Sequence, residues 1–353
     1  MNENKRMKEF SSQISEGYDF EGPTLLLGGS ILDGSPVKDL VIRLPLATMN
    51  RHGLIAGATG TGKTKTLQVI AEGLSEAGVS SVLMDIKGDL SGIAAPGDGH
   101  PKIDERHESI GEPWRSQACP VEFYSLDETP GVKLRSTITE FGPILFSRIL
   151  DLNDTQTGIM SLLFKYCDDQ KLPLVDLNDL KAVLRFITGE GKTSIEKEYG
   201  RVSGASVSAI MRKVIQIEQQ GAEKFLGEPS FDINDFIRQD GDGKGYVNVI
   251  RLIEVQDKPH LFSTFMLSVL DEIYESLPES GDTDKPKMVL FIDEAHLIFR
   301  NATKTLLDQL EMMVKLIRSK GVGIIFCTQN PSDVPPVILS QLGLKVQHAL
   351  RAF

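Results

Sequence analysis

The chain has 353 residues, of which 41% are hydrophobic and 25% are charged; it is long enough to bury a large core. Its net charge of -11 at pH 7 argues against a protein that coats nucleic acid with its whole surface, although a basic channel formed within an oligomer stays open. The polar N-terminus leads into no apolar signal core, and no run approaches the roughly 18 apolar residues of a membrane helix. We therefore expect a cytoplasmic protein with no membrane partner.

Strands and helices alternate in the predicted pattern. A polar segment, residues 1–22, precedes two strands separated by a turn at Asp33-Gly34, and residues 94–118 are rich in Pro, Gly and charge, which predicts a long surface loop. Strands are predicted at 24–31, 40–44, 51–56, 79–85, 246–253, 288–293 and 322–328. Helices are predicted over 63–77, 261–277 and 306–317, and a helical pattern runs from 143 to about 236. Residues 350–353 are predicted as the end of a strand, which indicates a piece of a longer protein.

This alternation predicts an α/β fold with a mostly parallel sheet. The helical block lies between strands of the pattern, so we interpret it as an insertion. The predicted organisation is an N-terminal arm with a small β element at 1–50, a core at 51–142 and 245–353, and a helical insertion at 143–244.

Residues 57–64, Gly-Ala-Thr-Gly-Thr-Gly-Lys-Thr, match the phosphate-binding pattern G-x-x-x-x-G-K-[ST] in full. Glycines let backbone N–H groups converge on phosphate oxygens, and the helix that begins near Lys63 directs its positive end at the same oxygens. Lys63 is predicted to bridge the β- and γ-phosphates, and the Thr64 hydroxyl to bind Mg²⁺. The alternative is a plain glycine-rich turn, which the preceding strand and following helix disfavour. The predicted ATP-binding residues are Gly57, Ala58, Thr59, Gly60, Thr61, Gly62, Lys63, Thr64 and Lys65.

A second motif follows the apolar strand that begins at Met288. The strand delivers Asp293 and Glu294 to its carboxyl end, where α/β folds bind ligands. Asp293 is predicted to hold the magnesium shell, and Glu294 to act as the general base for the attacking water. The alternative is a surface acid pair that begins a helix.

Three further places are candidates on weaker grounds. Gln329 follows a strand, where it can sense the γ-phosphate or orient water, or simply end the strand. Arg318 lies in the last turn of a helix, where it serves as an arginine finger for a neighbouring subunit or only complements the helix dipole. The segment 85–89, Asp-Ile-Lys-Gly-Asp, either touches the nucleotide region or forms a plain turn.

At these motifs the chain resembles the HerA–FtsK superfamily of P-loop ATPases, and in particular the bacterial HerA-like helicases. The resemblance begins near Gly22 and covers most of the chain. It rests on 51–64 (RHGLIAGATGTGKT), 85–90 (DIKGDL), 291–296 (FIDEAH), 317–321 (IRSKG) and 328–331 (TQNP).

The resemblance implies a RecA-like P-loop NTPase with an additional strand, 322–328, between the strands of the two motifs. Lys63, Asp293, Glu294 and Gln329 match nucleotide-site positions of the family, and Arg318 matches the arginine finger of the related conjugative coupling ATPases. Such proteins form hexameric rings that move DNA, or sometimes protein, through a pore. HerA itself has an N-terminal barrel, for which only residues 1–50 remain here.

Three functions stay open: an ATP-driven DNA translocase or helicase, an ATPase that pumps or remodels protein, and a slow nucleotide-gated scaffold. Glu294 favours hydrolysis, and the resemblance favours DNA and a homo-hexamer, with a nuclease or another protein as an unidentified partner. No helix-turn-helix, zinc finger or stacking platform is evident. Basic residues of the insertion are candidates for DNA phosphates, or else form a solvated helical face: Lys192, Lys197, Arg201, Arg212 and Lys213.

Overall fold

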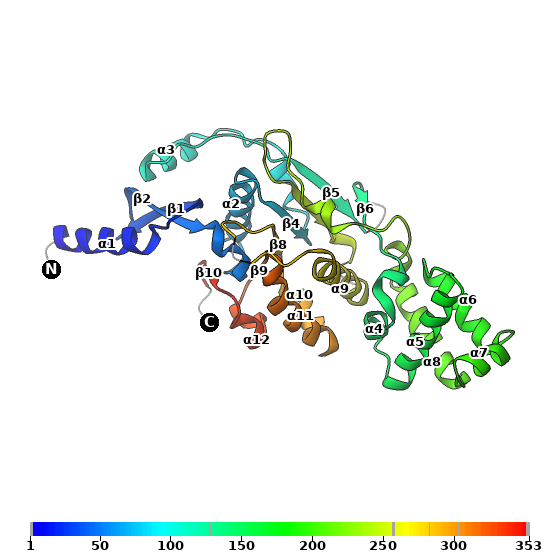
Figure 1. Ribbon diagram of the computed structural model, residues 1–353. Helices are drawn as coiled ribbons and strands as arrows, with labels where there is room; N and C mark the ends of the chain where they lie inside the picture. The colour runs from blue at the N-terminus through cyan, green and yellow to red at the C-terminus, as the bar shows by residue number, and fades with distance from the viewer. Residues whose placement is uncertain (1–2, 127–128, 256–257, 282, 302–303, 351–353) are drawn as a thin grey trace.

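The computed structural model describes residues 3–126, 129–255, 258–281, 283–301 and 304–350. The described chain is elongated (Figure 1): the N-terminal helix lies at one end, a group of helices at the other, and a large sheet between them. An antiparallel hairpin of β1 (Thr24–Leu32) and β2 (Ser35–Pro45) stands beside that sheet.

The large sheet has the strand order β10-β3-β9-β8-β4-β7-β5-β6, and every neighbouring pair is parallel. Its strands are β3 (Gly53–Ala56), β4 (Ser80–Asp85), β5 (Val121–Ser125), β6 (Val132–Lys133), β7 (Val247–Arg251), β8 (Met288–Ile292), β9 (Val322–Thr328) and β10 (Leu344–Gln347). The predicted α/β class is confirmed. So is the additional strand, because β9 lies between β3, which precedes the glycine-rich loop, and β8, which precedes Asp293.

The α-helices account for about half of the chain outside the strands. They are α1 (Glu3–Tyr18), α2 (Lys63–Glu76), α3 (Pro101–Ile110), α4 (Ile138–Ile149), α5 (Asp154–Asp169), α6 (Leu177–Thr188), α7 (Lys192–Glu198), α8 (Gly204–Gln219), α9 (Pro259–Ser276), α10 (His296–Asn301), α11 (Lys304–Leu316) and α12 (Pro336–Leu339). None of the helices in the described part of the chain combines the length and apolar character that a bilayer crossing requires.

Two cores cover the two faces of the sheet, because successive side chains of a strand point to opposite faces. In β8, Val289 and Phe291 pack with the buried face of α2, whereas Leu290 and Ile292 pack with α9 and α11. All five residues of β8 are buried. The fold is therefore a three-layer sandwich that holds the ends of its central strands in fixed positions.

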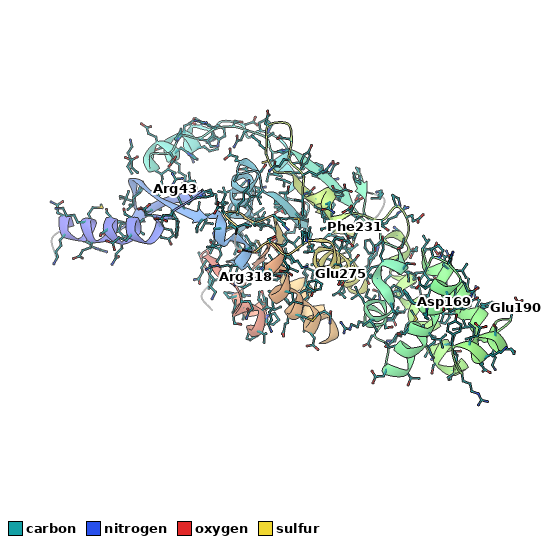
Figure 2. All side chains as sticks on the ribbon, in the orientation of Figure 1. Arg43, Asp169, Glu190, Phe231, Glu275 and Arg318 are labelled. Atoms are coloured by element: carbon teal, nitrogen blue, oxygen red, sulfur yellow. The ribbon has the colours of Figure 1, made fainter. Side chains whose placement is uncertain are left out.

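The helical insertion forms the far end of the molecule, where Asp169 and Glu190 are labelled (Figure 2). Side-chain caps begin its helices: Asn153 caps α5 and Asp176 caps α6, each within a capping box. Helix α4 begins at Ile138, five residues before the predicted block, and its backbone leaves helical geometry at Gly142. The domain boundaries given above remain predictions.

The predicted surface loop at 94–118 is wrong in part, because it contains α3. The His100 side chain accepts a hydrogen bond from the Lys102 backbone, Pro101 occupies the first turn, and Gly111 ends the helix with a φ of 82°. Strands β5 and β6 were not predicted. The C-terminal prediction also needs correction: the last strand ends at Gln347, Leu350 lies outside it, and 351–353 lie outside the described residues.

Candidate functional site

The glycine-rich loop joins the end of β3 to the start of α2. The backbone N–H of Gly57 donates to the Thr328 carbonyl at 3.2 Å, which fixes the loop's first residue on β9. Gly60 and Gly62 have φ values of 81° and 99°, a region that favours glycine. An added Cβ at Gly60 would meet nothing within 4 Å, so the tip is open to a ligand.

Lys63 places its ammonium inside this loop. Its Nζ donates to the carbonyl of Gly57 at 2.6 Å and to that of Ala58 at 3.2 Å. Burial lowers the pKa of Lys63, and the positive charge of Lys87 lowers it further. Thr64 follows in the first turn of α2, whereas the ammonium of Lys65 binds the Gln68 side chain at 2.9 Å.

The other predicted loop residues fix the shape of the turn. The Thr61 hydroxyl donates to the Ala58 carbonyl at 2.7 Å. Thr59 and Gly60 are exposed at the tip, and Gly62 caps α2. The loop thus combines backbone N–H groups, a cation and a helix start, which is the chemistry of a phosphate site.

Asp293 and Glu294 follow β8 at the same edge of the sheet. They are 6% and 3% exposed. Burial raises the pKa of Asp293 to about 6, a rise that the charge of Lys87 opposes. Glu294 has a φ of 48°, which is uncommon for a residue with a side chain and is typical of functional sites.

Two other side chains contact the carboxylate of Glu294. The Lys87 ammonium forms an ion pair with Oε1, and Nδ1 of His296 lies 3.0 Å from Oε2. Lys87 belongs to the turn after β4, the strand next to β8. The segment 85–89 therefore reaches the site, as one of its two interpretations proposed.

Gln329 and Arg318 lie at opposite ends of β9. Gln329 follows Thr328, the last residue of β9, and is half-buried between the ends of β3 and β8. Arg318, labelled in Figure 2, lies in a 3-10 turn, η6 (Ile317–Lys320), before the first residue of β9. Seven strand residues separate the two positions by about 20 Å. The structure thus brings Gln329 to the site and keeps Arg318 away from the site of its own chain.

His348 is a residue of this site that the sequence analysis missed. Its Nδ1 lies 2.9 Å from the Thr61 carbonyl oxygen and its Nε2 lies 3.1 Å from Oγ1 of Thr66. The next residue's carbonyl accepts from the Ala58 N–H at 2.9 Å. A Cβ on Gly57 would lie 2.4 Å from the Cβ of His348, so the glycine is needed where the C-terminal segment crosses the loop. No local pattern signals a contact over 287 residues.

A cavity of about 1010 Å³ opens beside the loop. Its walls are the start of α2, the β1–β2 hairpin, α3 and His348. Arg43, labelled in Figure 2, helps to hold these walls together through an ion pair with Glu112 at 2.7 Å. Apolar side chains from three walls, such as Leu27, Val69 and Ile110, face this space, which suits a planar ring system.

The donor set also fits a magnesium ion that is shared with phosphate groups. Within the described residues, no cluster of three or more His, Cys, Asp or Glu side chains could hold a metal by itself. The hydroxyl of Thr64 and the carboxylate of Asp293 are hard oxygen ligands, and Mg²⁺ in nucleotide sites is bound by few protein groups plus phosphates and water.

A parallel sheet with a glycine-rich loop and lysine after one strand, and an Asp-Glu pair two strands away, defines a P-loop NTPase of the RecA-like type. The chain matches the family model "Helicase HerA-like C-terminal" over residues 31–353 and belongs to this family. The resemblance inferred from the motifs is confirmed at this level.

Curated relatives carry the same signal across most of the chain. The DNA double-strand break repair helicase HerA of Sulfolobus acidocaldarius is 21% identical over 334 residues, which are 93% of this chain and 61% of the relative. The protein of the same name from Sulfurisphaera tokodaii is 26% identical, over 92% of this chain and 60% of the relative. The chain thus spans about three fifths of the length of these relatives.

Solved structures agree on the fold. The plasmid coupling protein TrwB, in complex with the non-hydrolysable ATP analogue ADPNP, has a TM-score of 0.53 at 18% identity, covering 92% of this chain and 78% of that one. VirB4 of Thermoanaerobacter pseudethanolicus has a TM-score of 0.55 at 15% identity, covering 94% and 86%.

Proposed function

We propose that this chain is an ATP-binding and ATP-hydrolysing motor of the HerA–FtsK type, and that it works as a ring-forming DNA translocase or helicase. One observation carries the ATPase part. Four adjacent strands, β3, β9, β8 and β4, each deliver one part of the site to the same edge: the loop with Lys63, Gln329, the pair Asp293–Glu294, and Lys87. The buried Glu294, with its positive φ, supports hydrolysis over a nucleotide-binding scaffold.

In this proposal Lys63 and the loop N–H groups bind the β- and γ-phosphates, and Thr64 and Asp293 are the residues that would hold Mg²⁺. The ion would neutralise charge on the phosphate oxygens. Glu294 accepts the proton of the attacking water, and Gln329 orients that water or senses the γ-phosphate. The nucleoside occupies the cavity beside α2, which His348 and Val69 help to line. TrwB, which shares the fold, has been solved with ADPNP and with ADP and Mg²⁺.

The motor part rests on the family and on the position of Arg318. Curated relatives are named DNA repair helicases, which supports DNA as the substrate. Arg318 is exposed at the edge opposite the nucleotide site of its own chain, so only a neighbouring subunit can place it at a phosphate. A ring of identical subunits provides that neighbour.

The test is phosphate release by the purified protein with and without random-sequence duplex DNA, across a salt series. We expect stimulation by DNA and a steep loss of DNA affinity with salt, because a motor that moves over any sequence contacts phosphates. Lys63→Ala should abolish hydrolysis and weaken ATP binding. Glu294→Gln should lower turnover by at least about 10²-fold while ATP still binds.

Two results would contradict separate parts of the proposal. Wild-type turnover by Glu294→Gln would remove Glu294 as the base. Hydrolysis without any DNA binding at low salt would remove the DNA motor and favour an ATPase that remodels protein.

A further inference from the structure

The proposed mechanism assigns functions to the glycine-rich loop and to the Asp-Glu pair. It assigns none to Lys87, which is a further cation at this site. Its ammonium forms an ion pair with Oε1 of Glu294. The Glu294 side chain is 3% exposed, whereas that of Lys87 is 47% exposed. The contact therefore joins a fixed, buried acid to a flexible side chain that has room to move.

The backbone under Lys87 is held firmly. The fully buried carboxylate of Asp85 accepts hydrogen bonds from the N–H of Gly88 at 2.6 Å and from that of Leu90 at 3.3 Å. Gly88 has a φ of 81°, and a Cβ there would lie 2.7 Å from Cδ1 of Ile253. The turn is thus fixed by Asp85, and the four-carbon stem of Lys87 supplies the freedom of movement.

The ion pair opposes the role of Glu294 as a base. The ammonium covers Oε1 and so keeps this oxygen from facing a water molecule. Oε2 is buried, lies 3.0 Å from Nδ1 of His296 and accepts no hydrogen bond from the described residues. His296 is fixed at the first residue of α10 and its side chain is 14% exposed. The ion pair between Lys87 and Glu294 is therefore the contact that can be released.

A triphosphate offers Lys87 a better partner. Lys87 is close enough to the loop for its charge to lower the pKa of Lys63. A terminal phosphate carries more negative charge than one carboxylate and has three acceptor oxygens, and a lysine binds such a group as a mobile point charge.

We propose that Lys87 is a γ-phosphate-binding residue, which moves from Glu294 to the terminal phosphate of bound ATP and thereby frees Glu294 for the attacking water. The inference rests on the proposed function, since it requires a site that binds ATP. It makes Lys87 a sensor of the third phosphate, because ADP leaves Lys87 on Glu294.

The test compares binding of ADPNP and ADP, each with Mg²⁺, to the purified chain by titration calorimetry. Lys87→Met should weaken ADPNP binding by about tenfold, the lower end for a hydrogen bond to a charged group, and change ADP binding by less than about twofold. Lys87→Arg keeps the charge and should recover most of the preference. Lys224→Met, at an exposed lysine of the insertion, is the matched control and should leave both affinities unchanged.

A second variant separates phosphate binding from a general loss of structure. Glu294→Gln removes the competing carboxylate, so as a single substitution it should tighten ADPNP binding. Its effect should be clearly smaller when it is combined with Lys87→Met. Three results would overturn the inference. Lys87→Met could weaken ADPNP and ADP binding equally, or weaken neither. The effects of the two substitutions on ADPNP affinity could also simply add. If the wild-type chain binds neither nucleotide, the proposed ATPase function itself fails.

Discussion

Replacing His52 by glutamine is expected to change how the stability of the protein depends on pH. The His52 side chain is buried, Nδ1 accepts a hydrogen bond from the Ile324 N–H at 2.9 Å, and Nε2 lies 2.6 Å from the Val314 carbonyl oxygen. The backbone N–H can only donate, so Nδ1 carries no proton and Nε2 donates. The ring is therefore neutral, and protonation would set Nδ1–H against the Ile324 donor.

The size of the effect on the free energy of unfolding follows from the pKa of His52. Burial lowers the pKa of His52 from 6.5 to about 4, and the charge of Arg318 contributes to the lowering. As the pH falls, the unfolded chain binds this proton first, so the stability that His52 contributes is complete above pH 6.5 and is lost as the pH falls to about 4. The difference between the two pKa values corresponds to about 3 kcal/mol.

The measurement is urea unfolding, followed by circular dichroism, at several pH values. Asp271 and Asp293 have pKa values raised to about 6, chiefly by burial; they act in the opposite direction, so the informative quantity is the difference between variant and wild type. The cost of His52→Gln should shrink by about 3 kcal/mol between pH 8 and pH 4. Ile324→Val, which removes a buried methylene and no titratable group, should cost about 1 kcal/mol at every pH. A cost of His52→Gln that does not vary with pH would refute the reasoning.

Two further outcomes are expected from the site. Mixing inactive Arg318→Ala subunits with inactive Lys63→Ala subunits should restore part of the ATPase activity, because an arginine supplied by a neighbour contributes about 10³–10⁵ in rate. No recovery in confirmed mixed rings would exclude a role in trans. His348→Ala removes both contacts of the imidazole with the loop and α2, so calorimetry should show ADPNP and ADP binding weakened alike, by about three- to tenfold. A loss restricted to ADPNP would mean that His348 touches the γ-phosphate instead.

The parts of the fold that the sequence predicted are those with strong local signals. The glycine-rich loop, the apolar strand before Asp293 and the strand at 322–328 each carry a pattern set by their own residues. Helix α3 had its start and stop signals in Pro101 and Gly111, but it has no buried residue, so the apolar periodicity that identifies a helix was too weak. Strands β5 and β6 are short, and β6 is exposed.

The sequence predicts those residues of the candidate site that belong to a single local motif. Lys63, Asp293 and Glu294 follow from motifs, and strand order then brings them to one edge. Lys87 lay in a segment with two equal interpretations, because only the pairing of β4 with β8 shows that the turn faces Glu294. His348 reaches the loop only because β10 pairs with β3. No sequence pattern in residues 344–350 indicates that pairing.

Strand β9 has a mechanical consequence. It is buried along all seven residues and is hydrogen-bonded to β3 on one side and to β8 on the other. Its last residues accept the N–H groups of Gly57 and Ala295, and its first residue follows the turn that carries Arg318. Because β9 is hydrogen-bonded on both sides, it cannot shift along its axis without breaking its hydrogen bonds to both neighbouring strands. The core is therefore stiff along this strand. In the proposed ring, a displacement at the nucleotide edge would reach the next subunit as a tilt of the whole core rather than as the bending of one loop.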